Sequence, residues 1–174
     1  ILVFFSCSED DSDEAEKPQN DNPTWISKLS IGDGRNIGQS VLMTNEGGYI
    51  IAGTYNSGYK RICIIKSNSM GEKLSSICSD TGEGKSIQQT HDGGYIVTGI
   101  SLGDSYFHDN NSVFVQKIES PNNWKKNLVS SFGGSEGSSI KQTHDGGYII
   151  TGSVTITIAP DSLNGEAYLI KTGP

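Results

Sequence analysis

The chain has 174 residues, of which 22 are glycine and 33% are hydrophobic, and it carries a net charge of −7. This composition is typical of a turn-rich β protein with one domain, and it argues against a wholly disordered chain. Six of the seven net negative charges lie in residues 1–21, so the remainder is nearly neutral and has no basic stripe for nucleic acid. No stretch approaches the roughly 20 apolar residues that a membrane-spanning helix needs.

Residues 1–7 are a short apolar run followed by the small Ser6 and by Cys7. They resemble the lipobox of bacterial lipoproteins, in which a signal peptidase cuts before the cysteine and a diacylglycerol is attached to its thiol. The resemblance implies a truncated signal peptide over residues 1–7 and a lipid attached at Cys7. Such a protein is anchored to a membrane rather than spanning it. The alternative is an exported chain in which Cys7 is only a thiol.

Residues 8–24 are acidic and poor in apolar side chains. They cannot bury enough apolar surface to fold, so we expect a disordered, self-repelling tether. The acidic run that follows Cys7 also resembles the export signal that sends some Gram-negative lipoproteins to the outer leaflet. This resemblance implies an exported, lipid-anchored protein of the outer membrane or cell surface.

The rest of the chain repeats one motif with a period near 50 residues, at 46–53, 92–99 and 145–152. Each copy reads acid-Gly-Gly-Tyr-Ile-x-x-Gly, and a further glycine precedes its first Gly by nine positions in all three copies. Strands and tight turns demand such strict spacing, because a shift of one residue turns every side chain to the other face. The period predicts units at about 25–74, 75–129 and 130–174, which bury their apolar faces by stacking.

The second unit shows the expected elements most clearly. We expect strands at 86–90, 95–98, 112–118 and 124–129, with a hairpin turn at 91–94. In that turn Asp92, Gly93 and Gly94 are structural residues, and the glycines and Asp accept positive φ. Asp145, Gly146 and Gly147 hold the same places in the third unit.

The middle strands are apolar without alternation, as at 62–65 and 168–170. Such runs indicate burial on both faces of a sheet, which favours the blades of a β-propeller over a sandwich. We therefore expect an all-β fold, a partial β-propeller of about three four-stranded antiparallel blades. Closed rings have about four to eight blades, so this would be a fragment of a larger ring, or a ring completed by association.

The units resemble the Asp-Gly-Gly-Tyr-Ile-x-x-Gly repeats of bacterial secreted and surface propeller-like proteins, over about residues 25–174. The first unit departs from the pattern with Asn45-Glu46. The second has Gly71 where the count from Trp25 and Trp124 places a tryptophan. The resemblance implies a fold and a location more than an activity.

Several polar residues recur with the repeat, among them His91 with His144 and Lys66 with Lys117 and Lys171. A catalytic residue is needed once, so we interpret the histidines as turn residues and the lysines as charges at sheet edges. The sequence contains no metal-site spacing and no catalytic arrangement above chance. We therefore predict no cofactor, no metal and no catalytic residue.

The loops between the second and third strands vary in length and carry exposed aromatic candidates. Tyr55 and Tyr59 lie in the first of these loops, and Tyr106, Phe107 and His108 lie in the next. Variable loops on a rigid scaffold often carry recognition, so these five residues are a hypothetical binding face for an unknown glycan or protein. The alternative is that they fold back onto the blade edge.

Cys63 and Cys78 fall opposite each other if their hairpin turns near residues 70–71. Exported proteins permit disulfides, and close cross-strand pairs can form them. A bridge and a pair of buried thiols both remain open at this point.

These observations predict a surface-anchored lipoprotein that acts as a non-catalytic binding or structural propeller module. One alternative is part of a propeller hydrolase that acts on glycans or peptides. Another is an adaptor whose open blade edge pairs with a different outer-membrane component. The expected partners are a membrane, through the lipid, and an unknown glycan or protein, with no nucleic acid.

Overall fold

The computed structural model describes residues 25–102, 111–128, 134–159 and 162–174. Cys7, the tether at 8–24 and the loop residues Tyr106, Phe107 and His108 lie outside the described residues. Within these ranges the chain is all-β and antiparallel, as expected, and contains no helix that could cross a membrane.

The strands form a seven-stranded antiparallel sheet, β1 to β7 in sequence order, and a three-stranded sheet in the order β10-β9-β8. Their bounds are β1 (Arg35–Met43), β2 (Tyr49–Asn56), β3 (Lys60–Ser67), β4 (Lys73–Gln89), β5 (Tyr95–Ser101), β6 (Ser112–Ile118), β7 (Trp124–Leu128), β8 (Ser135–Gln142), β9 (Tyr148–Ala159) and β10 (Ser162–Lys171).

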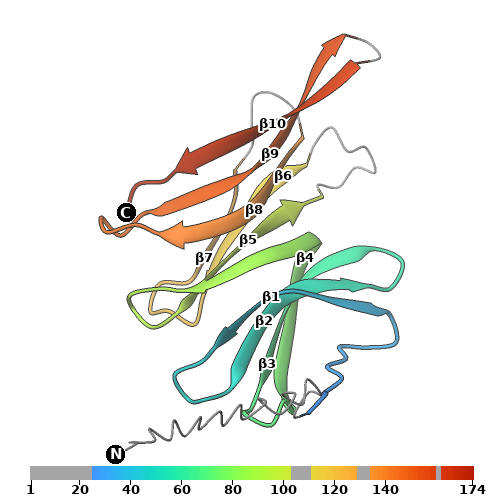
Figure 1. Ribbon diagram of the computed structural model, residues 1–174, viewed down its shortest axis with the longest axis vertical. Helices are drawn as coiled ribbons and strands as arrows, with labels where there is room; N and C mark the ends of the chain where they lie inside the picture. The colour runs from blue at the N-terminus through green and yellow to red at the C-terminus, as the bar shows by residue number, and fades with distance from the viewer. Residues whose placement is uncertain (1–24, 103–110, 129–133, 160–161) are drawn as a thin grey trace, which may run out of the picture.

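The long strand β4 divides the larger sheet into two halves. Residues 73–81 of β4 pair with β3, and residues 82–89 pair with β5. We call β1, β2, β3 and residues 73–81 sheet A, and we call residues 82–89 with β5, β6 and β7 sheet B. The three-stranded sheet is sheet C. Figure 1 shows A, B and C stacked in this order along the long axis of the molecule.

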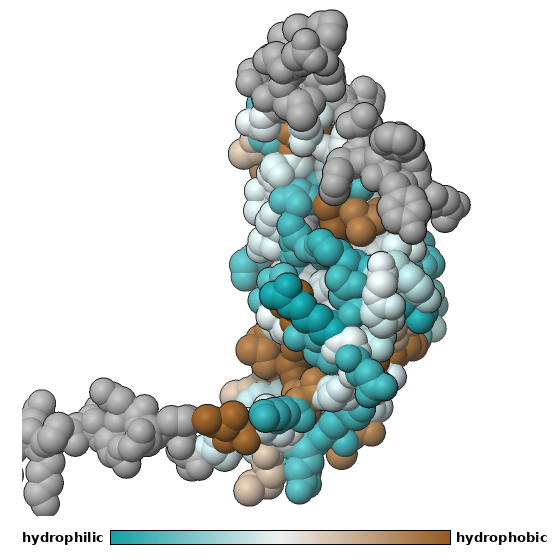
Figure 2. All heavy atoms as spheres, turned by 90° about the vertical axis from the view of Figure 1, so that its right-hand side faces the viewer, coloured by the Kyte–Doolittle hydropathy of each residue, from teal (hydrophilic) through white to brown (hydrophobic). Residues whose placement is uncertain are grey.

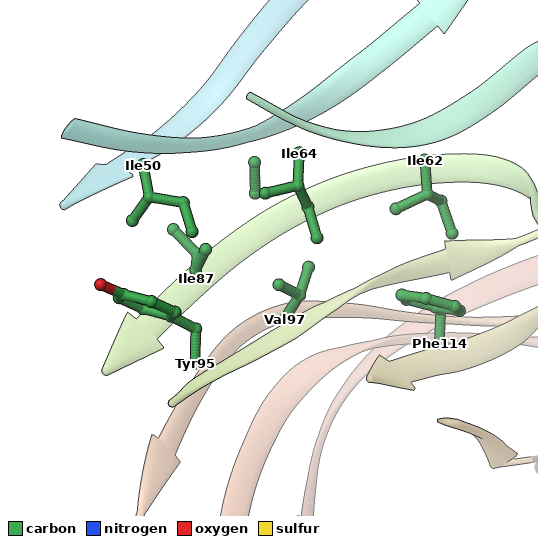
Figure 3. Close-up of a cluster of buried hydrophobic side chains, with 8 residues drawn as sticks. Ile50, Ile62, Ile64, Ile87, Tyr95, Val97 and Phe114 are labelled. Atoms are coloured by element: carbon green, nitrogen blue, oxygen red, sulfur yellow. The ribbon is translucent and has the colours of Figure 1, made fainter. Parts of the chain in front are cut away.

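Two apolar cores lie between the three sheets, and sheet B contributes to both of them. The core between sheets A and B, drawn in Figure 3, contains Ile50, Ala52, Ile62, Ile64, Ile87, Tyr95, Val97 and Phe114. The other core joins sheet B to sheet C and contains Ile96, Val113, Val115, Ile140, Tyr148 and Ile150. Neighbouring residues of β5 and β6 thus point to opposite cores. The prediction that the unalternating apolar runs are buried on both faces is confirmed at 62–65, where all four side chains are buried, and wrong at 168–170, where Leu169 faces solvent.

The outer faces of sheets A and C are covered less completely. In sheet C, Ile150 is fully buried while Thr151 is exposed and Leu169 is 70% exposed. On sheet A, Trp25 packs against Tyr49 with ring centroids 5.9 Å apart. Figure 2 shows polar side chains over much of one side of the stack, with small apolar patches between them. Scattered patches of this kind are normal for a protein surface.

A β-bulge recurs at the same place in each sheet, and it explains two of the recurring glycines. The bulges lie at Gly38/Ser40, Gly84/Ser86 and Gly137/Ser139. The partner strand places Gly53, Gly99 and Gly152 opposite them. A Cβ atom on any of these three would collide with a carbonyl oxygen of the bulged strand. The spacing between the glycines is therefore strict because two backbones meet there.

The recurring turn needs positive φ at its first glycine, with φ of 85° at Gly93 and 84° at Gly146. Asp92 and Gly94 do not share this conformation, so the expectation that the whole turn accepts positive φ is wrong. Gly94 is required for another reason: a Cβ there would lie 2.7 Å from the carbonyl oxygen of Ile118.

We predict that Gly93→Ala destabilises the protein by about 1–2 kcal/mol, the cost of placing an L residue in the left-handed region. Nothing lies within 4 Å of a Cβ at Gly93, so the loss would be conformational rather than steric. Urea denaturation measures the change. The control is Gly165→Ala in β10, where the added methyl is also free of contacts and no positive φ is required. Equal stabilities for the two variants would contradict the assignment.

Candidate functional site

The turn aspartate of sheet B is held by a set of hydrogen bonds that we call the turn clamp. Asp92 Oδ1 accepts a hydrogen bond from Thr90 Oγ1 at 2.6 Å. Its Oδ2 accepts from Lys117 Nζ at 2.6 Å and from Ser120 Oγ at 2.7 Å. The Lys117 ammonium, helped by these hydroxyls, holds the pKa of the Asp92 carboxyl well below its usual range.

Sheet C repeats the clamp. Asp145 accepts hydrogen bonds from Thr143 Oγ1 at 2.5 Å, from Gly147 N at 3.1 Å and from Lys171 Nζ at 2.8 Å. Lys117 and Lys171 are therefore partners of the turn aspartates, and the interpretation of these two lysines as edge charges alone was incomplete. These carboxylates already have their partners within the scaffold, so the turn has a structural role.

The first unit departs from the clamp because Glu46 replaces the aspartate. Its lysine, Lys66, instead reaches sheet B and pairs with Glu119 at 2.5 Å. The Lys66 ammonium also lies 5.8 Å from the centroid of the Tyr95 ring. Burial opposes the charged form of Lys66, but Glu119 outweighs it and the pKa of Lys66 is raised. The two sheets are thus joined by an ion pair at this point.

Beside this ion pair lies a groove of about 540 Å³ between sheets A and B. We call it the A–B groove. A volume of this size falls within the range of small-molecule sites, roughly 300–1,000 Å³. Its lining is Ile64, Lys66, Ser75, Ser76 and Ile77 from sheet A, and Gln116, Lys117, Ile118, Glu119, Asn123, Trp124 and Lys125 from sheet B or the turn that follows β6.

The A–B groove corresponds to a place that a tryptophan fills between sheets B and C. In sheet B, Trp124 lies opposite Lys117 and packs edge-on against Tyr148 of sheet C, with ring centroids 5.8 Å apart. In sheet A, the residue opposite the equivalent Lys66 is Ser75. The count along the sequence, which pointed to Gly71, was therefore wrong about the equivalent position. The interface between sheets A and B lacks an indole because Ser75 stands in its place.

Two further residues of the A–B groove differ from their counterparts. Ile77, paired with Ile64, holds the position that Lys126 holds in β7, and it is 62% exposed. Gln116 holds the position of Ile170, which packs into the core between sheets B and C. The Gln116 Oε1 atom is buried and has no hydrogen-bond partner among the described residues.

The charged groups around the A–B groove are already paired. Lys125 forms an ion pair with Asp80 at 2.7 Å, and Lys66 and Lys117 are held as described above. The groove has the apolar side chains of Ile64, Ile77, Ile118 and Trp124, hydroxyls at Ser75 and Ser76, and the side chain of Gln116, whose buried Oε1 atom has no partner among the described residues. This arrangement suits the binding of a largely apolar group with a single donor.

The structure separates the two described tyrosines of the hypothetical binding face. The Tyr55 ring lies against the backbone of Gly32 and Gly34, where a Cβ on Gly32 would come within 2.7 Å of its hydroxyl. Tyr59 is 57% exposed. Of this pair, only Tyr59 is therefore open to a ligand, and the other three members lie outside the described residues.

Cys63 and Cys78 pair across β3 and β4 and form a disulfide, with Cα atoms 4.1 Å apart. The sequence left open a disulfide bridge or two buried thiols, and the structure contains the bridge. In the described ranges, no group of three or more His, Cys, Asp or Glu side chains is placed to hold a metal ion.

No protein-family model matches the chain, and no curated protein is similar to it.

We predict that the turn clamp makes stability depend on pH below about 4. Because the pKa of Asp92 is lowered on folding, its contribution is present above the unfolded value of about 4 and is lost as pH falls towards the folded value. Asp92→Asn should therefore destabilise the protein at pH 7, by less than about 1 kcal/mol given its exposure to solvent.

Chemical denaturation at neutral pH and at a pH of about 2.5 checks this prediction. The difference between wild type and Asp92→Asn should shrink at the acidic pH. Asp33→Asn is the matched control, because Asp33 is exposed and takes part in no ion pair within the described part of the chain. A difference between wild type and Asp92→Asn that stays constant over this range would argue against the clamp.

Proposed function

We propose that the chain is a non-catalytic binding module, built from β-propeller blades and tethered to the bacterial surface by a lipid on Cys7. Sheets A, B and C are its blades. The support for a blade arrangement is that the sheets are antiparallel, stack face to face and each repeat the same bulge and turn. β-Propellers bury the flat faces of their sheets against one another in this way.

One observation carries the binding function. The recurring aspartates and lysines of sheets B and C bond to one another within the scaffold, whereas the A–B groove departs from the repeat and contains a buried hydrogen-bond acceptor without a partner among the described residues. In a rigid repeat scaffold, the place that breaks the pattern is the best candidate for recognition.

Export is supported by the Cys63–Cys78 disulfide, because disulfides persist in oxidising compartments and are rare in the cytosol. The tether at 8–24 would hold the propeller clear of the membrane. Repulsion between its like charges would favour an extended tether.

Probing glycan and peptide arrays with the purified protein tests the binding function. We expect saturable binding of one ligand class, with the ligand recovered chemically unchanged. Turnover of a bound glycan or peptide would favour the hydrolase alternative. Absence of binding to both arrays would contradict the proposal.

We further predict that Cys7 carries a diacylglycerol in protein isolated from the membranes of the producing cells. Mass spectrometry of the amino-terminal peptide measures the lipid, and Cys7→Ala should move the protein out of the membrane fraction. An unmodified Cys7 in mature, membrane-derived protein would refute the anchor.

A further inference from the structure

We propose that the A–B groove binds a tryptophan side chain presented by an extended peptide of a partner protein. This inference deepens the binding function proposed above by naming the ligand group. The structure itself displays the fit, since the equivalent position between sheets B and C is filled by the indole of Trp124 against Tyr148.

The floor and wall of the groove suit an aromatic ring. Ser75 and Ile77 face sheet B from β4, because they pair with Lys66 and Ile64, which lie on the same face as the apolar core. Ile118 packs against that core from sheet B. An indole placed here would contact Ile77, which is now 62% exposed, and would remove its apolar surface from water.

The hydrogen-bonding groups favour an indole over a phenyl ring or a sugar. Gln116 Oε1 is buried and unpartnered within the described residues, and a buried acceptor without a donor is costly. The indole N–H is a single donor carried on an apolar body, which matches one acceptor in an apolar groove. A sugar would bring several hydroxyls, whereas the lysines around the groove are already engaged in ion pairs.

The edge of sheet A beside the groove suits an extended peptide. Residues 73–80 of β4 pair with β3 on one side only, so their other edge is free in the described structure, whereas Thr81 also accepts a hydrogen bond from Leu102 N. The exposed Leu74 and Ile77 lie along this edge, 66% and 62% accessible respectively. A free, partly apolar strand edge is the template on which a peptide adds as another strand.

Three variants separate the groove from the rest of the surface. Ser75→Trp introduces a tryptophan at the position equivalent to Trp124 of β7, so the protein's own indole should fill the groove. Gln116→Ile installs the residue found at the equivalent position of β10 and removes the acceptor. Ile77→Lys installs the residue of β7 at an exposed position, where the fold tolerates it.

The test is a titration of the protein with N-acetyl-tryptophanamide, followed by the NMR shifts of the Ile64, Ile77 and Ile118 methyl groups. We expect saturable shifts of these methyls, and none with N-acetyl-alaninamide. Ser75→Trp should weaken binding by at least about tenfold. Gln116→Ile and Ile77→Lys should each weaken it by about three- to tenfold.

The matched control is Ser138→Trp, which places the same side chain at an exposed serine of β8 in sheet C. It should leave the affinity for N-acetyl-tryptophanamide unchanged. A groove whose methyls do not respond to the probe, or an affinity that Ile77→Lys and Gln116→Ile leave intact, would overturn the inference. Saturable binding of a ligand on the arrays would still support the proposed function in that case, because it does not require a tryptophan. Failure of the groove inference can therefore be told apart from failure of the proposed function.

Discussion

The fold depends on sheet B, because one sheet supplies apolar side chains to two cores. Tyr95 and Val97 of β5 pack towards sheet A, while Ile96 between them packs towards sheet C. The same division separates Phe114 from Val113 in β6. Each fully buried side chain of this kind contributes roughly 1.5–3 kcal/mol relative to an exposed one. The position of sheet B therefore fixes that of both neighbours, and a change in its twist would disturb two interfaces together.

The bulge is common to the three sheets and the turn clamp to sheets B and C, whereas the connections between sheets make the two interfaces differ. Thirteen residues separate Trp124 from the bulge residue Gly137, but only nine separate Ser75, at the equivalent position, from Gly84. With the shorter connection, β4 runs directly from sheet A into sheet B, whereas β7 and β8 are separate strands. The A–B groove lies at the interface that has the continuous strand.

Local signals in the sequence were enough to predict the hairpins and the burial of the middle sheet, but not the continuous strand β4, which runs across the boundary expected between the first and second units. The Gly spacing and the apolar runs each act within one hairpin, so no knowledge of packing was needed. The A–B groove could not be predicted in this way, because Ser75 and Gln116 meet across two sheets and their register depends on irregular pairing in β4. One signal was present: Gln116 directly follows the apolar run 113–115, at a position where β10 has Ile170.

The two interfaces show what the open groove costs. Leaving a buried acceptor such as Gln116 Oε1 unpaired costs about 1–3 kcal/mol, and the exposure of Ile77 adds an unfavourable apolar contact with water. At the interface between sheets B and C, Trp124 and Ile170 pack into the corresponding space instead. The fold can therefore accommodate a tryptophan at this position, as the interface between sheets B and C does, but the interface between sheets A and B has none. In the A–B groove, this unpaired acceptor and the exposed Ile77 occur side by side, which is why we propose it as the ligand site.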